Sequence, residues 1–192
     1  MDMSIVEAQA DMRQGYYSGA PGIAASALAW SVAAGVAMTG TATTAVWALL
    51  LGGMLIHPVA MVIGKVLGAP DVHTKGNPLG PLAVASTAWL IFSLPLAYGL
   101  SLQSAGWFFL AMLLVIGGRY LVFATLYGMR LYWGLGMVLA LLAFALAAVS
   151  AAAYIAAMAG AAIEALFAII CFVQHRQWVR QAGPAEGTSK RF

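Results

Sequence analysis

Three ionisable side chains lie inside long apolar stretches of this sequence: His57, Arg119 and Glu164. A charged side chain deep in a bilayer costs at least about 2.5–3.5 kcal/mol, so such residues face protein and find partners. Arginine and glutamate can pair with each other or bind a charged solute, and an imidazole exchanges a proton near neutral pH. The three residues therefore predict a polar site within a membrane, with the hydroxyl of Tyr120 beside it.

The composition of the chain requires a bilayer around it. The 192 residues are 63% hydrophobic and only 8% charged, and the mean hydropathy is +0.91. A soluble domain has about 25% charged residues, so this chain cannot cover its own surface in water. Because a spanning helix needs roughly 20 apolar residues, about six helices fill the length. The composition thus predicts an all-α integral membrane protein, a six-helix bundle.

Six apolar segments mark these helices. They cover about 20–38, 44–65, 81–101 and 106–126, then a stretch from about 131 and, after a tight turn near Ser150, one from about 152 to 174. We expect an N-terminal interfacial segment over 1–19, a membrane domain over 20–175 and a basic tail over 176–192, whose Gly, Pro, Ser and charge predict disorder. Within the first segment, residues 3–17 form either an amphipathic interfacial helix or a floppy tail.

The charges orient these helices. All nine Lys and Arg residues fall on one side of the predicted membrane, and the three turns on the other side carry none. Short loops rich in Lys and Arg face the cytoplasm, so we expect both termini there. The modest net charge of +3 follows from this bias and does not indicate a nucleic-acid partner.

The three intramembrane residues fall at one depth. They belong to the second, fourth and sixth helices, each about 12–13 residues from the outer end, which is about 18–20 Å at 1.5 Å per residue. That level is slightly past the middle of a hydrocarbon core of about 30 Å. Glu164 is the only acid in the membrane segments, so Arg119 is expected to pair with it. The pair either fastens two helices together or lines a cavity or proton path; the remaining alternative is that the two side chains lie on helix faces that do not meet.

Two further features bear on a site. Pro58 follows His57 in the second helix, and proline removes a backbone hydrogen bond and clashes with the preceding turn. A kink is expected there, and broken helices form substrate sites in transporters. At the inner face, Lys65, Lys75 and Arg130 are close in topology and can dock an anionic headgroup or phosphate; the alternative is a solvated turn.

No catalytic, cofactor or metal pattern stands out. The sequence contains no HExxH, CxxC or GxSxG motif, and its single cysteine, Cys171, excludes an internal disulfide. We therefore expect no cofactor and no metal, and enzyme activity is not favoured.

Two resemblances follow from short strings. The stretch Lys75-Gly76-Asn77-Pro78-Leu79-Gly80, with Gly117-Gly118 and the run 123–127, resembles a family of small bacterial multipass membrane proteins of unknown function over about residues 45–130. It implies the fold and a bacterial inner membrane, and no activity. Ile163-Glu164 with the run 172–175 is similar to the last helix of the six-helix urea/amide channels, which implies that a glutamate there can serve a small-solute pore. That family places its termini outside, opposite to the charges here.

The leading functional prediction is a small-solute or ion channel or transporter, with His57, Arg119, Tyr120 and Glu164 binding the substrate or ion. One alternative is a membrane enzyme acting on a lipid or isoprenoid, and another is a non-catalytic lipid-binding or assembly subunit. Expected partners are the bilayer, anionic lipid at the inner face, and further copies of the chain in a homo-oligomer.

Overall fold

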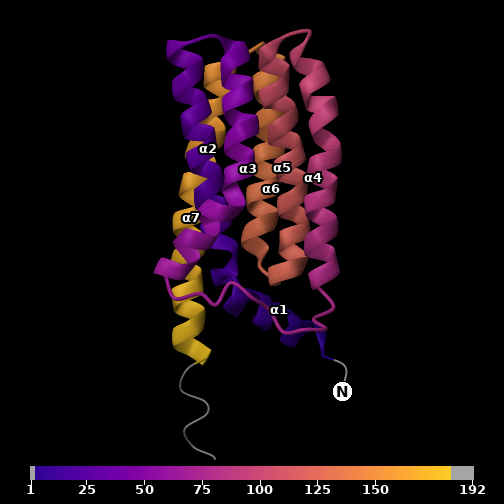
Figure 1. Ribbon diagram of the computed structural model, residues 1–192, viewed down its shortest axis with the longest axis vertical. Helices are drawn as coiled ribbons and strands as arrows, with labels where there is room; N and C mark the ends of the chain where they lie inside the picture. Colours follow the sequence, from indigo (N-terminus) through magenta and orange to yellow (C-terminus); the bar gives the residue numbers. More distant parts are fainter. Residues whose placement is uncertain (1–2, 183–192) are drawn as a thin grey trace, which may run out of the picture.

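A computed structural model describes residues 3–182 as seven α-helices and one short 3-10 turn (Figure 1). The helices are α1 Ile5–Gly15, α2 Ala20–Thr39, α3 Ala42–Val66, α4 Gly80–Ser101, α5 Ala105–Tyr127, α6 Arg130–Ala148 and α7 Ala153–Ala182, and the 3-10 turn Tyr17–Gly19 joins α1 to α2. Six helices, α2 to α7, are long and apolar enough to cross a membrane. The predicted all-α, six-helix membrane fold is confirmed.

The six long helices run side by side, and α1 lies across one end of the bundle, here named the α1 end (Figure 1). In the interior, α2 packs on α3 and α7, while α5 packs on α4 and α6. Helices α3 and α4 keep most of their surface exposed. The segment 67–79 between them crosses the α1 end of the bundle (Figure 1). Helices α3 and α4 therefore follow each other in sequence without packing closely along their length.

Glycine sets the distance between two of the central helices. A Cβ atom on Gly117 of α5 would lie 2.9 Å from the carbonyl oxygen of Gly136 on α6, and a Cβ on Gly136 would lie 2.7 Å from that of Gly117. Small residues let helix backbones approach in this way in membranes. The α5–α6 contact is therefore a backbone-to-backbone crossing, one turn or less from Arg119.

The N-terminal segment forms a helix, so the floppy-tail alternative is wrong. Ser4 caps α1 and forms a reciprocal capping box with Glu7, which satisfies free amides at the helix start. Ala8 and Met12 are buried against the bundle. Helix α1 is thus a fixed lateral element at the α1 end.

The last helix is longer than predicted. Residues 176–182 were expected in a disordered tail, but α7 continues through Ala182. His175 packs against Trp178 with ring centroids 5.8 Å apart, and the guanidinium of Arg13 lies over the Trp178 ring at 5.7 Å. These contacts extend the helix past the end of the apolar run. The rest of the predicted tail, 183–192, lies outside the described residues.

Candidate functional site

The polar residues in the membrane form two sites, on different faces of α5. Arg119 and Tyr120 are neighbours on this helix, and neighbouring residues on an α-helix point about 100° apart. Tyr120 is buried and bonded to Glu164 on α7, whereas Arg119 is partly exposed and bonded to Thr87 on α4. The single polar site predicted from the sequence is therefore divided by α5.

The first site is the buried pair of Tyr120 and Glu164. The Tyr120 hydroxyl donates a hydrogen bond of 2.9 Å to Oε1 of Glu164, and Glu164 is 0% exposed. Ser26 of α2, itself buried, lies beside both groups. Oε2 of Glu164 has no hydrogen-bond partner among the described residues. The site is therefore a carboxyl group buried among α2, α5 and α7, and only one of its two oxygens accepts a hydrogen bond from a described residue.

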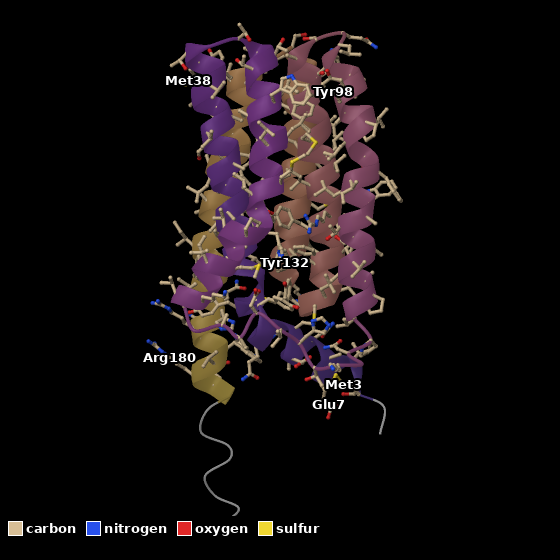
Figure 2. All side chains as sticks on the ribbon, viewed as in Figure 1. Met3, Glu7, Met38, Tyr98, Tyr132 and Arg180 are labelled. Atoms are coloured by element: carbon tan, nitrogen blue, oxygen red, sulfur yellow. The ribbon has the colours of Figure 1, made fainter. Side chains whose placement is uncertain are left out.

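Aromatic packing holds the Tyr120 ring in place. Tyr120 stacks on Tyr132 of α6, with ring centroids 5.9 Å apart. Tyr127 also stacks on Tyr132, with centroids 5.4 Å apart. The Tyr132 hydroxyl donates a 2.6 Å hydrogen bond to the carbonyl oxygen of Ser18. Figure 2 shows Tyr132 in the half of the bundle nearer the α1 end. With its ring fixed, the Tyr120 hydroxyl points at Glu164 without needing to reorganise.

The second site centres on Arg119. Its Nη2 donates to the Thr87 hydroxyl oxygen at 3.2 Å, and its guanidinium lies 5.1 Å from the centroid of the Phe123 ring. Its Nε has no partner among residues 3–182. Within the described part of the chain no ion pair joins Arg119 to Glu164, so the expected pairing is wrong. The depth count put both residues at one level but did not resolve the faces on which they lie.

One turn of α4 separates Thr87, the partner of Arg119, from an apolar groove between α3 and α4 that lies toward the end of the bundle away from α1 (Figure 2). The groove has a volume of about 360 Å³. Its walls are Trp47 and Leu50 from α3 and Ile91, Leu94, Pro95 and Tyr98 from α4. Thr87 precedes Ile91, Leu94 and Tyr98 by four, seven and eleven residues, which places it on the same helix face. Tyr98 marks the far end of this face in Figure 2. Through its bond to Thr87, the cation of Arg119 therefore lies about one helical turn from the α4 wall of the groove.

His57 does not join Glu164. It is exposed on α3 and makes no hydrogen bond to any described residue. It follows Leu50 by seven residues, about two turns, and therefore shares the face of α3 that lines the groove. Pro58 lies inside α3, which continues unbroken from Ala42 to Val66. The kink stays a prediction, and the structure relates His57 to the groove rather than to the buried carboxyl.

The three predicted headgroup cations lie exposed at the ends of their helices or in the α3–α4 segment. Lys65, Lys75 and Arg130 make no hydrogen bond within residues 3–182, and no contact brings the three together. They remain candidates for attracting anions rather than members of a built site.

The α1 end instead contains a polar lock that sequence reasoning missed. The carboxylate of Asp11 accepts bonds from the Thr74 amide at 2.9 Å, the Thr74 hydroxyl at 2.8 Å and the Asn77 side-chain amide at 2.7 Å. Arg13 donates to the carbonyls of Tyr127 and Gly128. Burial opposes ionisation of Asp11, but these hydrogen bonds outweigh it and lower the pKa of its carboxyl. Helix α1 is thereby fastened to both loops at this end.

A second missed cluster surrounds Ser18. Its side-chain oxygen lies 2.8 Å from Nδ1 of His175, and its carbonyl accepts from Tyr132 and from the Cys171 thiol at 3.5 Å. Ser18 has a φ of 56°, a left-handed conformation that no pattern in the sequence announces. Within residues 3–182, no group of three or more His, Cys, Asp or Glu residues is placed to hold a metal ion.

Comparison with known proteins gives one family. No curated protein and no solved structure matches the chain. One family model, described as a family of unknown function (DUF7010), matches residues 5–174. That match includes α1, the whole of α2 to α6 and α7 as far as residue 174, whereas the resemblance seen in the sequence covers only about 45–130. The chain therefore belongs to the DUF7010 family, a family of unknown function.

Proposed function

We propose that this protein binds a membrane-resident amphiphile with an anionic headgroup in the groove between α3 and α4, and that Arg119 is the cation that recognises it. The observation that carries this proposal is the state of Arg119. It lies within a membrane span and has no acidic partner among the described residues. A charge at this depth needs a counter-ion or water, and an anionic ligand supplies the counter-ion.

The chemistry of Arg119 suits a phosphate or carboxylate. A guanidinium has five N–H donors in a planar fork. Nη2 of Arg119 donates to the neutral hydroxyl of Thr87, and the buried Nε has no partner among the described residues. The fork binds two oxygens of an anion at once, which a lysine cannot do. Phe123 below the guanidinium adds a cation–π contact and fixes its plane. The apolar walls of the groove suit the acyl chain of the same ligand.

The position of Arg119 indicates the leaflet from which the ligand comes. Arg119 lies eight residues before the end of α5, about 12 Å from the α1 end, and its long side chain can extend toward that surface. The basic residues at this end, including Lys65, Lys75 and Arg130, favour a cytoplasmic α1 end by the positive-inside rule. We therefore place both termini in the cytoplasm of a bacterial cell and the ligand in the inner leaflet of its inner membrane. The same cations attract anionic lipid of that leaflet to the α1 end of the bundle.

Lipid selectivity measured by electron paramagnetic resonance tests the proposal. Spin-labelled phosphatidylglycerol and phosphatidylcholine would be added to the reconstituted protein, and the immobilised fraction of each compared. We expect wild type to prefer phosphatidylglycerol and Arg119→Gln to lose most of that preference. Arg180→Gln is the matched control, since it removes an exposed cation at the α1 end (Figure 2). Equal preference in wild type and Arg119→Gln would reject the proposal.

A small-solute or ion transporter is the second candidate function. Its support is Glu164, whose buried Oε2 lacks a partner and can bind a transported ion or proton. Flux into proteoliposomes tests it: transport by wild type that Glu164→Gln abolishes would favour this candidate. A lipid-acting enzyme would use the same groove as the proposed ligand and would reveal itself by chemical change of the bound lipid.

A further inference from the structure

The buried carboxyl of Glu164 makes one hydrogen bond, and the groove ligand does not explain it. Oε1 accepts from Tyr120, and Oε2 has no partner within residues 3–182. The residue is 0% exposed and is the only Asp or Glu in the six spans. An ionisable side chain inside a membrane span is energetically costly, and such residues are rare and commonly functional.

The surroundings of Glu164 contain few charges. Helix α5 contributes Tyr120 in direct contact and the cation of Arg119 at longer range. Helix α2 contributes Ser26 and has no titratable side chain. Helix α6 contributes Tyr132, which stacks on Tyr120. No described Lys, Arg or His forms an ion pair with Glu164, and its own helix places no other titratable residue within a turn of it.

An ionised Glu164 would be poorly stabilised in this setting. A buried carboxylate costs far more than the neutral hydroxyls of Tyr120 and Ser26 return, even where both donate to it. A protonated carboxyl needs much less: its carbonyl oxygen accepts from Tyr120, and its O–H needs a single acceptor. The oxygen of Ser26 lies beside the carboxyl and can accept. The geometry fits a carboxylic acid better than a carboxylate.

We propose that Glu164 is a proton-binding site, occupied at neutral pH, and that its occupancy is linked through Arg119 to the anionic ligand in the α3–α4 groove. The link rests on the function proposed above; the proton site does not. The proton site is formed by residues on a different face of α5 from the one that carries Arg119.

The link follows from electrostatics. The charge of Arg119 reaches Glu164 and favours the ionised carboxylate. An anion bound to Arg119 neutralises that charge, so the carboxylate loses its support and Glu164 takes up a proton. Linkage is reciprocal, so protonation of Glu164 strengthens binding of the anion by the same factor. Ligand and proton therefore bind together, as they do in a carrier that moves both in one direction.

Infrared difference spectroscopy tests both parts. The protein in phosphatidylcholine nanodiscs would be titrated from mildly acidic to alkaline pH, and the carbonyl stretch of a protonated carboxylic acid followed. Because Glu164 is the only acid in the spans, a band in the apolar region of the spectrum that is missing in Glu164→Gln belongs to it. Tyr120→Phe removes one hydrogen bond and should shift this band without abolishing it. That variant assigns the band if Glu164→Gln does not fold.

The expected result is a Glu164 band at neutral pH that is lost at alkaline pH. At an alkaline pH at which the band is partly lost, adding phosphatidylglycerol should strengthen the band in wild type and leave it unchanged in Arg119→Gln. Absence of the band at neutral pH, or a band that never titrates, would overturn the proton site. Phosphatidylglycerol that binds without changing the band would overturn the link alone. If it does not bind at all, the link fails together with the proposed function, while the pH titration still decides the proton site.

Discussion

The hydroxyl of Tyr120 donates a 2.9 Å hydrogen bond to Glu164, joining α5 to α7 at a point where the carboxyl is fully buried. This contact replaces the ion pair expected between Arg119 and Glu164, and the two relationships predict different costs of mutation. Glu164→Gln keeps an acceptor for Tyr120 and places no charge in the core. It should lower the free energy of unfolding by no more than about 1.5 kcal/mol, the size of one hydrogen bond.

Thermal unfolding of the detergent-solubilised variants measures this cost at neutral pH. Tyr120→Phe removes the donor, and the double variant completes a cycle that isolates the pairwise energy. A loss of about 3–5 kcal/mol in Glu164→Gln would instead indicate a broken buried ion pair, and the assignment of Tyr120 as the main partner would then be wrong.

The depth of the polar residues could be predicted from the sequence, and their grouping could not. Hydropathy marks where a helix enters and leaves the bilayer, and a rise of 1.5 Å per residue then fixes the level of each side chain. The face on which a residue lies depends on how the helix is rotated about its axis. The apolar residues of helix α5 are spread around its whole circumference, so its sequence pattern does not indicate that rotation. Tyr120 was consequently expected as a neighbour of the site and is instead the partner of Glu164.

Some further contacts were hidden for different reasons. Thr87 is an unremarkable hydroxyl in sequence, and its role appears only because α4 packs beside α5 and Arg119 reaches it. Residues 176–182 have a composition typical of a tail, and only the stacking of Trp178 beneath Arg13 shows why the helix continues. Asp11 and Asn77 are 66 residues apart, and local patterns do not report contacts at that separation.

The α5–α6 crossing gives a prediction with an internal control. Gly117→Ala would force its Cβ against the Gly136 carbonyl at 2.9 Å, whereas Gly118→Ala meets nothing within 4 Å. We expect Gly117→Ala to lower the free energy of unfolding by about 1–3 kcal/mol, the range for overpacking, and Gly118→Ala to leave it nearly unchanged. Thermal unfolding of the two variants side by side measures the difference; equal effects would show that the helices do not cross at Gly117.

Thr87 should tune lipid selectivity through Arg119. Thr87→Val keeps the shape of the side chain but removes the oxygen that accepts from Nη2 at 3.2 Å. Hydrogen bonds to charged groups contribute about 1.5–3 kcal/mol. The preference for phosphatidylglycerol should therefore fall about tenfold in Thr87→Val and return to the wild-type value in Thr87→Ser. The immobilised fraction of spin-labelled lipid reports the preference. Identical values for Val and Ser at this position would show that Thr87 does not position the arginine.

The lock at the α1 end should weaken in acid. Hydrogen bonds from Asn77 and Thr74 outweigh the opposing effect of burial and lower the pKa of Asp11 below its ordinary value near 3.8. A carboxyl with a depressed pKa in the folded state stabilises the fold above its unfolded pKa, and this contribution is lost as pH falls through the folded value. Attachment of α1 should therefore persist at neutral and mildly acidic pH and loosen only below about pH 4.

Amide hydrogen exchange in α1 and in residues 71–79 measures that attachment. Asp11→Asn removes the charge at every pH, so its protection factors, the intrinsic exchange rates divided by the rates measured at the same pH, should fall at neutral pH to the level that wild type reaches only in acid. If wild type and Asp11→Asn exchange alike at neutral pH, the carboxylate does not hold α1 in place.

The groove itself is best examined with an anionic phospholipid that carries a photoreactive group next to its phosphate. After irradiation of the reconstituted protein, mass spectrometry would map the labelled residues in wild type and in Arg119→Gln. Binding at Arg119 requires labels on α4 and α5 around Thr87 and Phe123, and these labels should disappear in Arg119→Gln but persist in Arg180→Gln. Labels confined to the exposed cations Lys65, Lys75 and Arg130, and unaffected by Arg119→Gln, would show that anionic lipid only coats the surface and that the groove does not bind it.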